Sequence, residues 1–195
     1  MSNSIEKITK EEIAKLPLSS FEGKIHLITQ KDQAIQACIK LNEQKLLGFD
    51  TEARPSFKKG EVYDVSLLQL STQDEAFIFR LNLFDMPSEL LAILESKDIV
   101  KAGAAIRDDI KDLQKLKKFT PESFYEIQDM ARDIGAKNFG LRSMAALFLG
   151  IRISKGAKLT NWENPTLTSA QLNYAATDAW IGYELYQKIS NYQSN

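Results

Sequence analysis

KLLGFDTE, residues 45–52, has the apolar run expected of a buried strand and ends in two acids. Two further strands are predicted after it, VYDVSLLQLS at residues 62–71 and AFIFR at residues 76–80, joined by a turn-like segment. Three consecutive strands predict an antiparallel meander in the first half of the chain. Helices and strands alternate in the second half, and this combination is typical of an α/β fold with a mixed central sheet flanked by helices.

The other elements are expected from the same spacing of apolar residues. Strands are predicted at residues 25–29, 99–102 and 125–129, and helices at residues 32–43, 88–96, 106–117 and 142–148. Gly150 is the expected C-cap of the last of these helices. The final helix is expected to start at the capping box of Thr168 and Gln171 and to run to about residue 190.

Length and composition fit one ordinary domain, because the chain has 195 residues, of which 44% are hydrophobic and 26% charged. We expect a lead-in with a short charged helix over residues 1–22 and a single domain over residues 23–195. Uncharged stretches such as residues 144–151 are far shorter than the roughly 20 apolar residues that span a membrane. The N-terminus has no apolar core of the signal-peptide type, so a cytoplasmic location without membrane contact is expected.

Histidine and cysteine are almost absent, since His26 and Cys38 are the single examples. This excludes an internal disulfide framework and a multi-cysteine zinc site, and Cys38 is expected in the core. Only His26 could serve a Ser-His-Asp arrangement, so chemistry must otherwise use carboxylates, hydroxyls, lysine or arginine. The formal net charge of −1 gives no overall basic signal for nucleic acid, although local basic loops are compatible with it.

Asp50 and Glu52 lie two residues apart in the first of the three strands, so their side chains point to the same face. Two like charges at this spacing repel, so either one carboxyl group is protonated or a cation lies between them. The alternative is a strand end that has run out into solvent.

A further acid is expected on the helix over residues 106–117, where Asp109 falls on the same side as Ile110 and Leu113. Asp108 falls on the opposite, solvent side. An inward carboxylate is costly unless it is paired or bound to a metal, and the alternative for Asp109 is an ion pair with a loop Arg or Lys.

In the final helix, Tyr174 and Asp178 share one stripe with Ile181 and Leu185. Asp178 therefore needs a partner, while Tyr174 alone could be an aromatic core residue. The four predicted inward carboxylates, in a chain with almost no His or Cys, indicate a metal site made of oxygen ligands. Such a site suits Mg²⁺ or Mn²⁺. Two such ions about 4 Å apart are the usual arrangement for in-line phosphoryl displacement, in which one activates water and the other stabilises the leaving oxygen.

Three segments carry a family resemblance: FDTE at residues 49–52, AGAAIRDDIKDL at residues 102–113 and YAATDAW at residues 174–180. They resemble the three motifs of the DEDD superfamily of 3′–5′ exonucleases. The flanking sequence at residues 161–179 resembles the ribonuclease D and Werner-syndrome exonuclease branch. The resemblance covers roughly residues 25–189 and implies a ribonuclease H-like fold. It also implies metal-ligand roles for Asp50, Glu52, Asp109 and Asp178.

Tyr174 stands four residues before Asp178, so the chain resembles the Tyr subclass, in which the phenol helps to position the attacking water. The resemblance thus implies a two-metal enzyme that acts on nucleic acid with a free 3′ end, DNA or RNA, and releases nucleoside 5′-monophosphates. Ala53 and Arg54 stand where an aromatic residue often follows the first motif, so the usual stacking of the terminal base is not expected.

Candidate phosphate contacts flank these motifs, and plain solvated side chains are the alternative for each of them. They are Arg54, Lys58, Lys59, Lys155 and Lys158. Trp162 is expected to pack against the final helix, with base stacking as its alternative, and Asp129 is a candidate acid at a strand end near the site. Two rival functions stay open: a catalytically silent nucleic-acid-binding or scaffold domain, and a magnesium phosphatase acting on small nucleotides.

Overall fold

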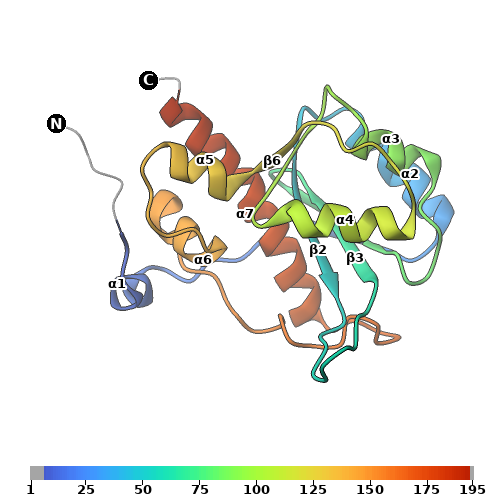
Figure 1. The fold of residues 1–195 in the computed structure, drawn as a ribbon, viewed down its shortest axis with the longest axis horizontal. Coiled ribbons are helices and arrows are strands. Elements are labelled where there is room, and N and C mark those ends of the chain that lie inside the picture. Colours follow the sequence, from blue (N-terminus) through green and yellow to red (C-terminus); the bar gives the residue numbers. More distant parts are fainter. Residues whose placement is uncertain (1–6, 194–195) are drawn as a thin grey trace.

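The computed structural model describes residues 7–193 of the chain, so the first six residues of the expected lead-in and the last two residues lie outside it. Within this range Figure 1 shows a central sheet with helices on both sides. The strands are β1 (Lys24–Ile28), β2 (Leu46–Ala53), β3 (Val65–Ser71), β4 (Glu75–Arg80), β5 (Val100–Gly103) and β6 (Phe124–Glu126). The helices are α1 (Lys10–Lys15), α2 (Lys31–Leu41), α3 (Ser88–Leu94), α4 (Ile106–Leu116), α5 (Ile127–Asp133), α6 (Leu141–Met144), the π-helical η1 (Ala145–Leu149) and α7 (Ser169–Gln193).

The six strands form one sheet in the order β1-β4-β3-β2-β5-β6. β2, β3 and β4 pair antiparallel, which confirms the predicted meander. β1 joins β4, β5 joins β2, and β6 joins β5, all in parallel. The sheet is therefore mixed, as the sequence predicts.

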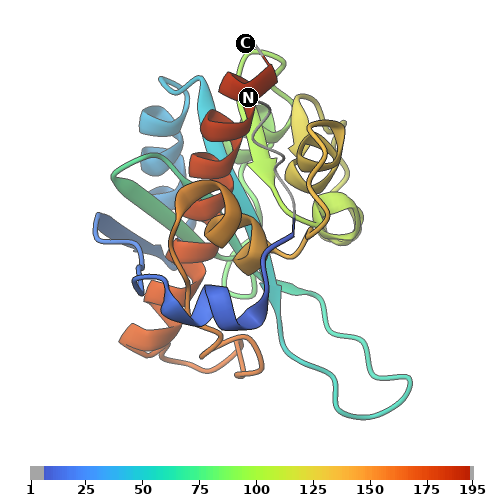
Figure 2. The same cartoon turned by 90° about the vertical axis from the view of Figure 1, so that its left-hand side faces the viewer.

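Side-chain alternation divides the core between the two faces of the sheet. Phe49, Leu68 and Leu70 point toward the layer of α2, α3 and α4. On the other face, Leu67 and Ile78 pack against alanines of α7. Figures 1 and 2 show α7 running along the sheet on the side opposite α4. The long helix is thereby held directly over β2 and β3.

Small residues allow α7 to approach the sheet closely. A Cβ atom at Gly48 of β2 would stand 1.9 Å from the carbonyl oxygen of Ala179, and one at Gly182 of α7 would stand 2.5 Å from that of Ala102. Glycine is therefore required at both positions for backbone to meet backbone. This close packing fixes the height of α7 over the part of β2 that carries the acids.

Both predicted helix caps are confirmed. The Thr168 hydroxyl accepts a hydrogen bond from the Gln171 backbone N–H at 3.2 Å, and the Gln171 side chain accepts one from the Thr168 N–H at 3.0 Å. Gly150 has φ of 69°, the left-handed conformation of a C-cap glycine. No helix among the described residues is long and apolar enough to span a membrane.

The predicted strand over residues 125–129 is wrong beyond its start, because β6 ends at Glu126 and α5 begins at the next residue. The Glu126 carboxylate accepts the backbone N–H of Gln128, and also those of Ala105 and Ile106 at the start of α4. One side chain thus caps two helices and ends the strand. Asp129 consequently lies on a helix and not at a strand end, and it pairs with Arg107 and Arg132 on the surface.

Candidate metal site

β2 supplies the first two acids from one face of the sheet. Phe49 is 1% exposed and packs into the core on the side of α4, so Asp50 and Glu52 point to the opposite side, toward α7. The chain does not run out into solvent here, because Asp50 pairs with Gln69 and Glu52 with Leu67 in the neighbouring strand β3. The same-face prediction for the two acids is confirmed.

α7 brings a third acid to this pair. Asp50, Glu52 and Asp178 are all half-buried, and each offers a carboxylate oxygen within 4.8 Å of those of the other two. Residues separated by more than one hundred positions in the chain thus converge on a single point. The sheet–helix contact at Gly48 places them there.

The electrostatics of this cluster disfavour three negative charges. Burial and the charge of Asp178 raise the pKa of Glu52 to about 8. Burial raises the pKa of Asp178 to about 6, although hydrogen bonding from Tyr174 and the charge of Lys158 oppose the rise. The pKa of Asp50 is also raised well above its usual value, by burial and then by Asp178. A divalent cation would relieve this repulsion.

Asp109 lies beside this cluster and not within it. Its carboxylate accepts a hydrogen bond of 2.5 Å from the Thr51 hydroxyl, which points to the α4 side of β2. Its negative charge contributes to the raised pKa of both Asp50 and Glu52. Asp108, by contrast, is exposed and pairs with Lys111 at 2.8 Å. The inward and outward orientations of the two neighbours match the helical spacing.

Tyr174 lies one helical turn before Asp178 and packs its ring 6.1 Å from the ring of Trp162. Burial and the nearby charge of Asp178 raise the pKa of the phenol, so it stays protonated at neutral pH. Trp162 is fully buried, which confirms its expected packing role and leaves no face for a base. Cys38 is also buried, as predicted.

Two loops with basic side chains flank the acids. The loop over residues 54–64, between β2 and β3, projects away from the body of the protein (Figure 2). Arg54 lies at its base, 3.4 Å from Glu163 and over the ring of Tyr63. Lys58 and Lys59 are exposed on this loop, and Lys155 is exposed on the segment before α7. Lys158 lies close enough to lower the pKa of both Glu52 and Asp178.

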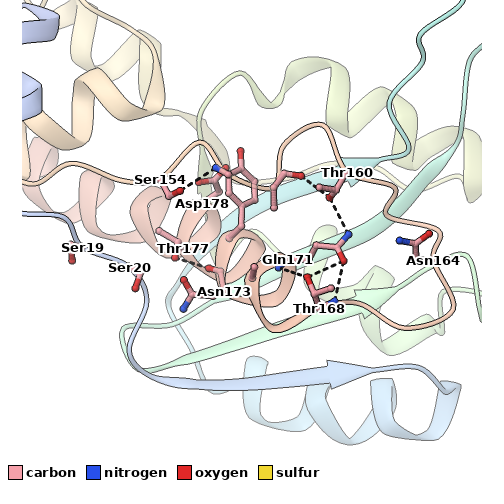
Figure 3. Close-up of a pocket in the computed structure, with 14 residues that line it drawn as sticks. Ser19, Ser20, Ser154, Thr160, Asn164, Thr168, Gln171, Asn173, Thr177 and Asp178 are labelled. Atoms are coloured by element: carbon pink, nitrogen blue, oxygen red, sulfur yellow. Dashed lines mark hydrogen bonds between the residues drawn. The ribbon is translucent and has the colours of Figure 1, made fainter.

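A cavity of about 470 Å³ opens beside the acids, along the N-terminal half of α7 (Figure 3). Tyr174 and Asp178 form part of its wall, and all the other lining residues are uncharged. It includes Ser19 and Ser20 of the lead-in, which the Phe21 N–H ties to the Thr177 hydroxyl at 3.0 Å. The lead-in therefore contributes to the surroundings of the site.

Sequence reasoning missed the supporting residues of the site. Thr51 stands between the two acids of FDTE. Strand alternation predicts that its side chain points to the opposite face, which is the side on which it contacts Asp109. Glu126 caps α4 and so holds the helix that carries Asp109, but its partners are twenty residues or more away in the chain. Only the folded arrangement reveals this contact.

The mixed six-stranded sheet flanked by helices and its half-buried cluster of three carboxylates define an α/β protein with a candidate metal site. The model of the 3′–5′ exonuclease family matches residues 25–192, and the chain therefore belongs to that family. The mouse bifunctional 3′–5′ exonuclease/ATP-dependent helicase WRN is 33% identical over 159 residues, which are 78% of this chain and 11% of the relative. The chain spans half or less of the length of the first curated relatives it matches.

Solved structures share the fold. The EXO domain of Aedes aegypti Nibbler superposes with a TM-score of 0.81 at 24% identity, over 90% of this chain and 93% of that one. Ribonuclease D of Trypanosoma brucei in complex with RNA U12 superposes with a TM-score of 0.76 at 16% identity, over 87% of this chain and 63% of that one. These likenesses confirm the predicted ribonuclease H-like architecture.

Proposed function

We propose that this chain is a metal-dependent 3′–5′ exonuclease that removes nucleoside 5′-monophosphates from the 3′ end of DNA or RNA. The observation that carries the proposal is the convergence of Asp50, Glu52 and Asp178 oxygens within 4.8 Å of one another. Membership of the 3′–5′ exonuclease family supports the direction of the reaction.

The donor set fits a hard divalent cation such as Mg²⁺ or Mn²⁺, because every candidate ligand is a carboxylate oxygen. The raised pKa values of Glu52 and Asp178 fit it too, since a cation lowers the cost of ionising both groups. Asp109, which lies beside the cluster, would help to hold a second ion. When bound, such ions supply an activated water and stabilise the leaving oxygen.

The residues of the chain have distinct tasks in this scheme. Asp50, Glu52, Asp109 and Asp178 hold the ions, and Thr51 fixes the orientation of Asp109. Tyr174 stays protonated beside Asp178, and its hydroxyl would turn from Asp178 to donate a hydrogen bond that orients the attacking water, the role that the resemblance to the Tyr subclass implies. The close contact of α7 with β2 keeps these groups in one geometry.

Nucleic acid is the proposed substrate, and the two basic loops would contact its phosphates. Lys58, Lys59 and Lys155 are exposed on either side of the acids, and Arg54 lies at the base of the first loop. Such contacts give affinity without sequence preference. The RNA bound to the Trypanosoma brucei ribonuclease D supports a nucleic-acid ligand for this fold.

The test is digestion of a 3′- or 5′-labelled single strand, in DNA and RNA form, with and without Mg²⁺. The wild-type protein should shorten the strand from its 3′ end and release 5′-monophosphates. Asp50→Asn and Asp178→Asn should abolish this activity, whereas Asp108→Asn, an exposed neighbour of Asp109, should retain it. Full activity in both of the first two variants would refute the proposal.

The same protein and substrates distinguish the exonuclease from the two rival functions. A silent binding domain should bind no Mn²⁺ in calorimetry and digest nothing. A phosphatase should release inorganic phosphate from a mononucleotide and leave the oligomer intact.

A further inference from the structure

Gln69 is the most unusual buried side chain near the acids. It lies in the middle of β3 and is 0% exposed. Neither its amide nitrogen nor its amide oxygen makes a hydrogen bond within the described residues. A buried polar group without a partner costs free energy, so its presence calls for a physical explanation.

The register of the sheet places Gln69 directly beside the acidic cluster. It pairs with Asp50 on one side and with Ile78 on the other. Directly opposed residues of antiparallel strands project to the same face with Cβ atoms about 5 Å apart. Of the two cross-strand neighbours, only Asp50 has a side chain that can hydrogen-bond. Asp50 is thus the cross-strand neighbour to which the Gln69 amide nitrogen can donate.

A second unpartnered group lies on the same face of the sheet. Arg80 pairs with Leu67, two residues before Gln69. Its two terminal nitrogens bind the carbonyl oxygens of Asn164 and Pro165 at 2.6 and 2.8 Å. Its Nε–H makes no hydrogen bond among the described residues. Because those carbonyls fix the guanidinium, the Nε–H offers a stationary donor on the residue diagonally across from Gln69.

We propose that Gln69 is a positioning residue of the metal site: its amide nitrogen donates to Asp50 while its amide oxygen accepts from Arg80 Nε. The contact would occupy one lone pair of the Asp50 carboxylate and hold the carboxylate in one orientation, with its remaining lone pairs for the cation. This inference rests on the proposed metal site. Groups that orient metal ligands in this way typically contribute about 10- to 100-fold to metal affinity.

The experiment compares Mn²⁺ binding and stability for Gln69→Met, which keeps the length of the side chain and removes both polar atoms. Ser66→Ala is the matched control, because Ser66 is also buried on β3 and its hydroxyl makes no hydrogen bond among the described residues, but it lies at the irregularity of the register and pairs with neither Asp50 nor Glu52. Calorimetry with Mn²⁺ alone gives the affinity, and thermal unfolding in a chelator gives the stability of the protein without the ion. Gln69→Leu repeats the test with a second apolar side chain.

The inference predicts that Gln69→Met binds Mn²⁺ about tenfold or more weakly, by analogy with other residues that orient metal ligands. Its melting temperature in chelator should not fall, because the proposed contacts are made on ion binding, and among the described residues the two amide atoms make no hydrogen bond. Ser66→Ala should bind Mn²⁺ like the wild type. In the wild type, the side-chain amide resonance of Gln69 should shift on addition of Mg²⁺.

Wild-type Mn²⁺ affinity in both Gln69 variants would overturn the inference and leave the metal site intact. Weaker binding accompanied by a matching loss of melting temperature in both variants would also overturn it, because a purely structural role would explain the result. Absence of Mn²⁺ binding in the wild-type protein would overturn the metal site itself, and this inference with it.

Discussion

Gly48 of β2 and Ala179 of α7 touch through their backbones, because a Cβ atom at position 48 would lie 1.9 Å from the Ala179 carbonyl oxygen. Ala179 follows Asp178, and Gly48 lies two residues before Asp50 on the same face of β2. The contact therefore sets the distance between the helix and the strand that supply the acids. Fold and site depend on the same pair of residues.

Gly48→Ala should consequently reduce both the stability of the fold and the metal affinity of the site. The added methyl group meets backbone atoms that cannot rotate away, so we expect a loss of about 2 kcal/mol or more in the free energy of unfolding. Variants that still fold should bind Mn²⁺ weakly, because α7 is displaced. Urea unfolding and calorimetry measure the two effects. Gly135→Ala, where an added Cβ meets nothing within 4 Å, is a comparison for local backbone strain without helix displacement.

The stability of the protein in a chelator should fall as the pH rises. The pKa of Glu52 is raised from 4.5 to about 8 and that of Asp178 from 3.8 to about 6. The unfolded chain therefore loses these protons at lower pH than the folded one. Stability is highest below the unfolded values and declines as the pH rises through the folded ones.

Urea unfolding at a series of pH values between about 4 and about 8 measures this slope. Glu52→Gln should flatten it, and Asp108→Asn should not. A slope of zero or of opposite sign in the wild-type protein would contradict the raised pKa values of Glu52 and Asp178 in the folded state. Addition of Mg²⁺ should flatten the profile and release protons, which calorimetry in buffers of different ionisation enthalpy detects.

Thr51→Val should reduce exonuclease activity about tenfold or more, the usual effect of losing a group that orients a metal ligand. The valine keeps the shape of the threonine but removes the hydroxyl that donates to Asp109 at 2.5 Å. Steady-state kinetics on a labelled strand measures the effect. The wild-type rate in this variant would mean that the contact does not orient Asp109.

Tyr174→Phe should lower kcat by about 100-fold or more while Mn²⁺ affinity stays near the wild-type value. The ring still packs against Trp162, and only the phenol hydroxyl is lost. A reduced Mn²⁺ affinity with unchanged kcat would instead make Tyr174 a residue of the metal site alone.

Removing the charges of Lys58 and Lys59 together should raise KM and leave kcat nearly unchanged, because both side chains are exposed on the loop between β2 and β3. Each lost phosphate contact should also reduce the steepness of the salt dependence of binding. Filter binding of an oligonucleotide at several salt concentrations tests this. The same removal of charge at Lys111 and Lys115 of α4, which pair with Asp108 and Asp112, is the control.

Periodicity predicted most of this fold because the strands and long helices each bury one regular face. It also predicted the orientations of Asp50, Glu52 and Asp109, which depend only on alternation or helical spacing. It failed at residues 127–129, where a strand-like run becomes a helix once Glu126 caps it. That cap also depends on the start of α4, a contact made only after folding.

The supporting polar groups lay beyond sequence reasoning for the same reason. Gln69 sits in an apolar strand, and its relation to Asp50 follows from the register between β2 and β3. Arg80 looked like the end of a strand, but it is buried and binds carbonyls more than eighty residues away. Such groups are found from cross-strand pairing and burial, neither of which a single sequence displays.

The central claim is that Asp50, Glu52 and Asp178 together bind a divalent cation. Anomalous diffraction from crystals of the wild-type protein soaked in Mn²⁺ tests it most directly. The account predicts a manganese peak in direct contact with oxygens of these carboxylates, and its loss in Asp178→Asn. A peak elsewhere, or a lysine or arginine side chain seated among the three acids, would contradict it.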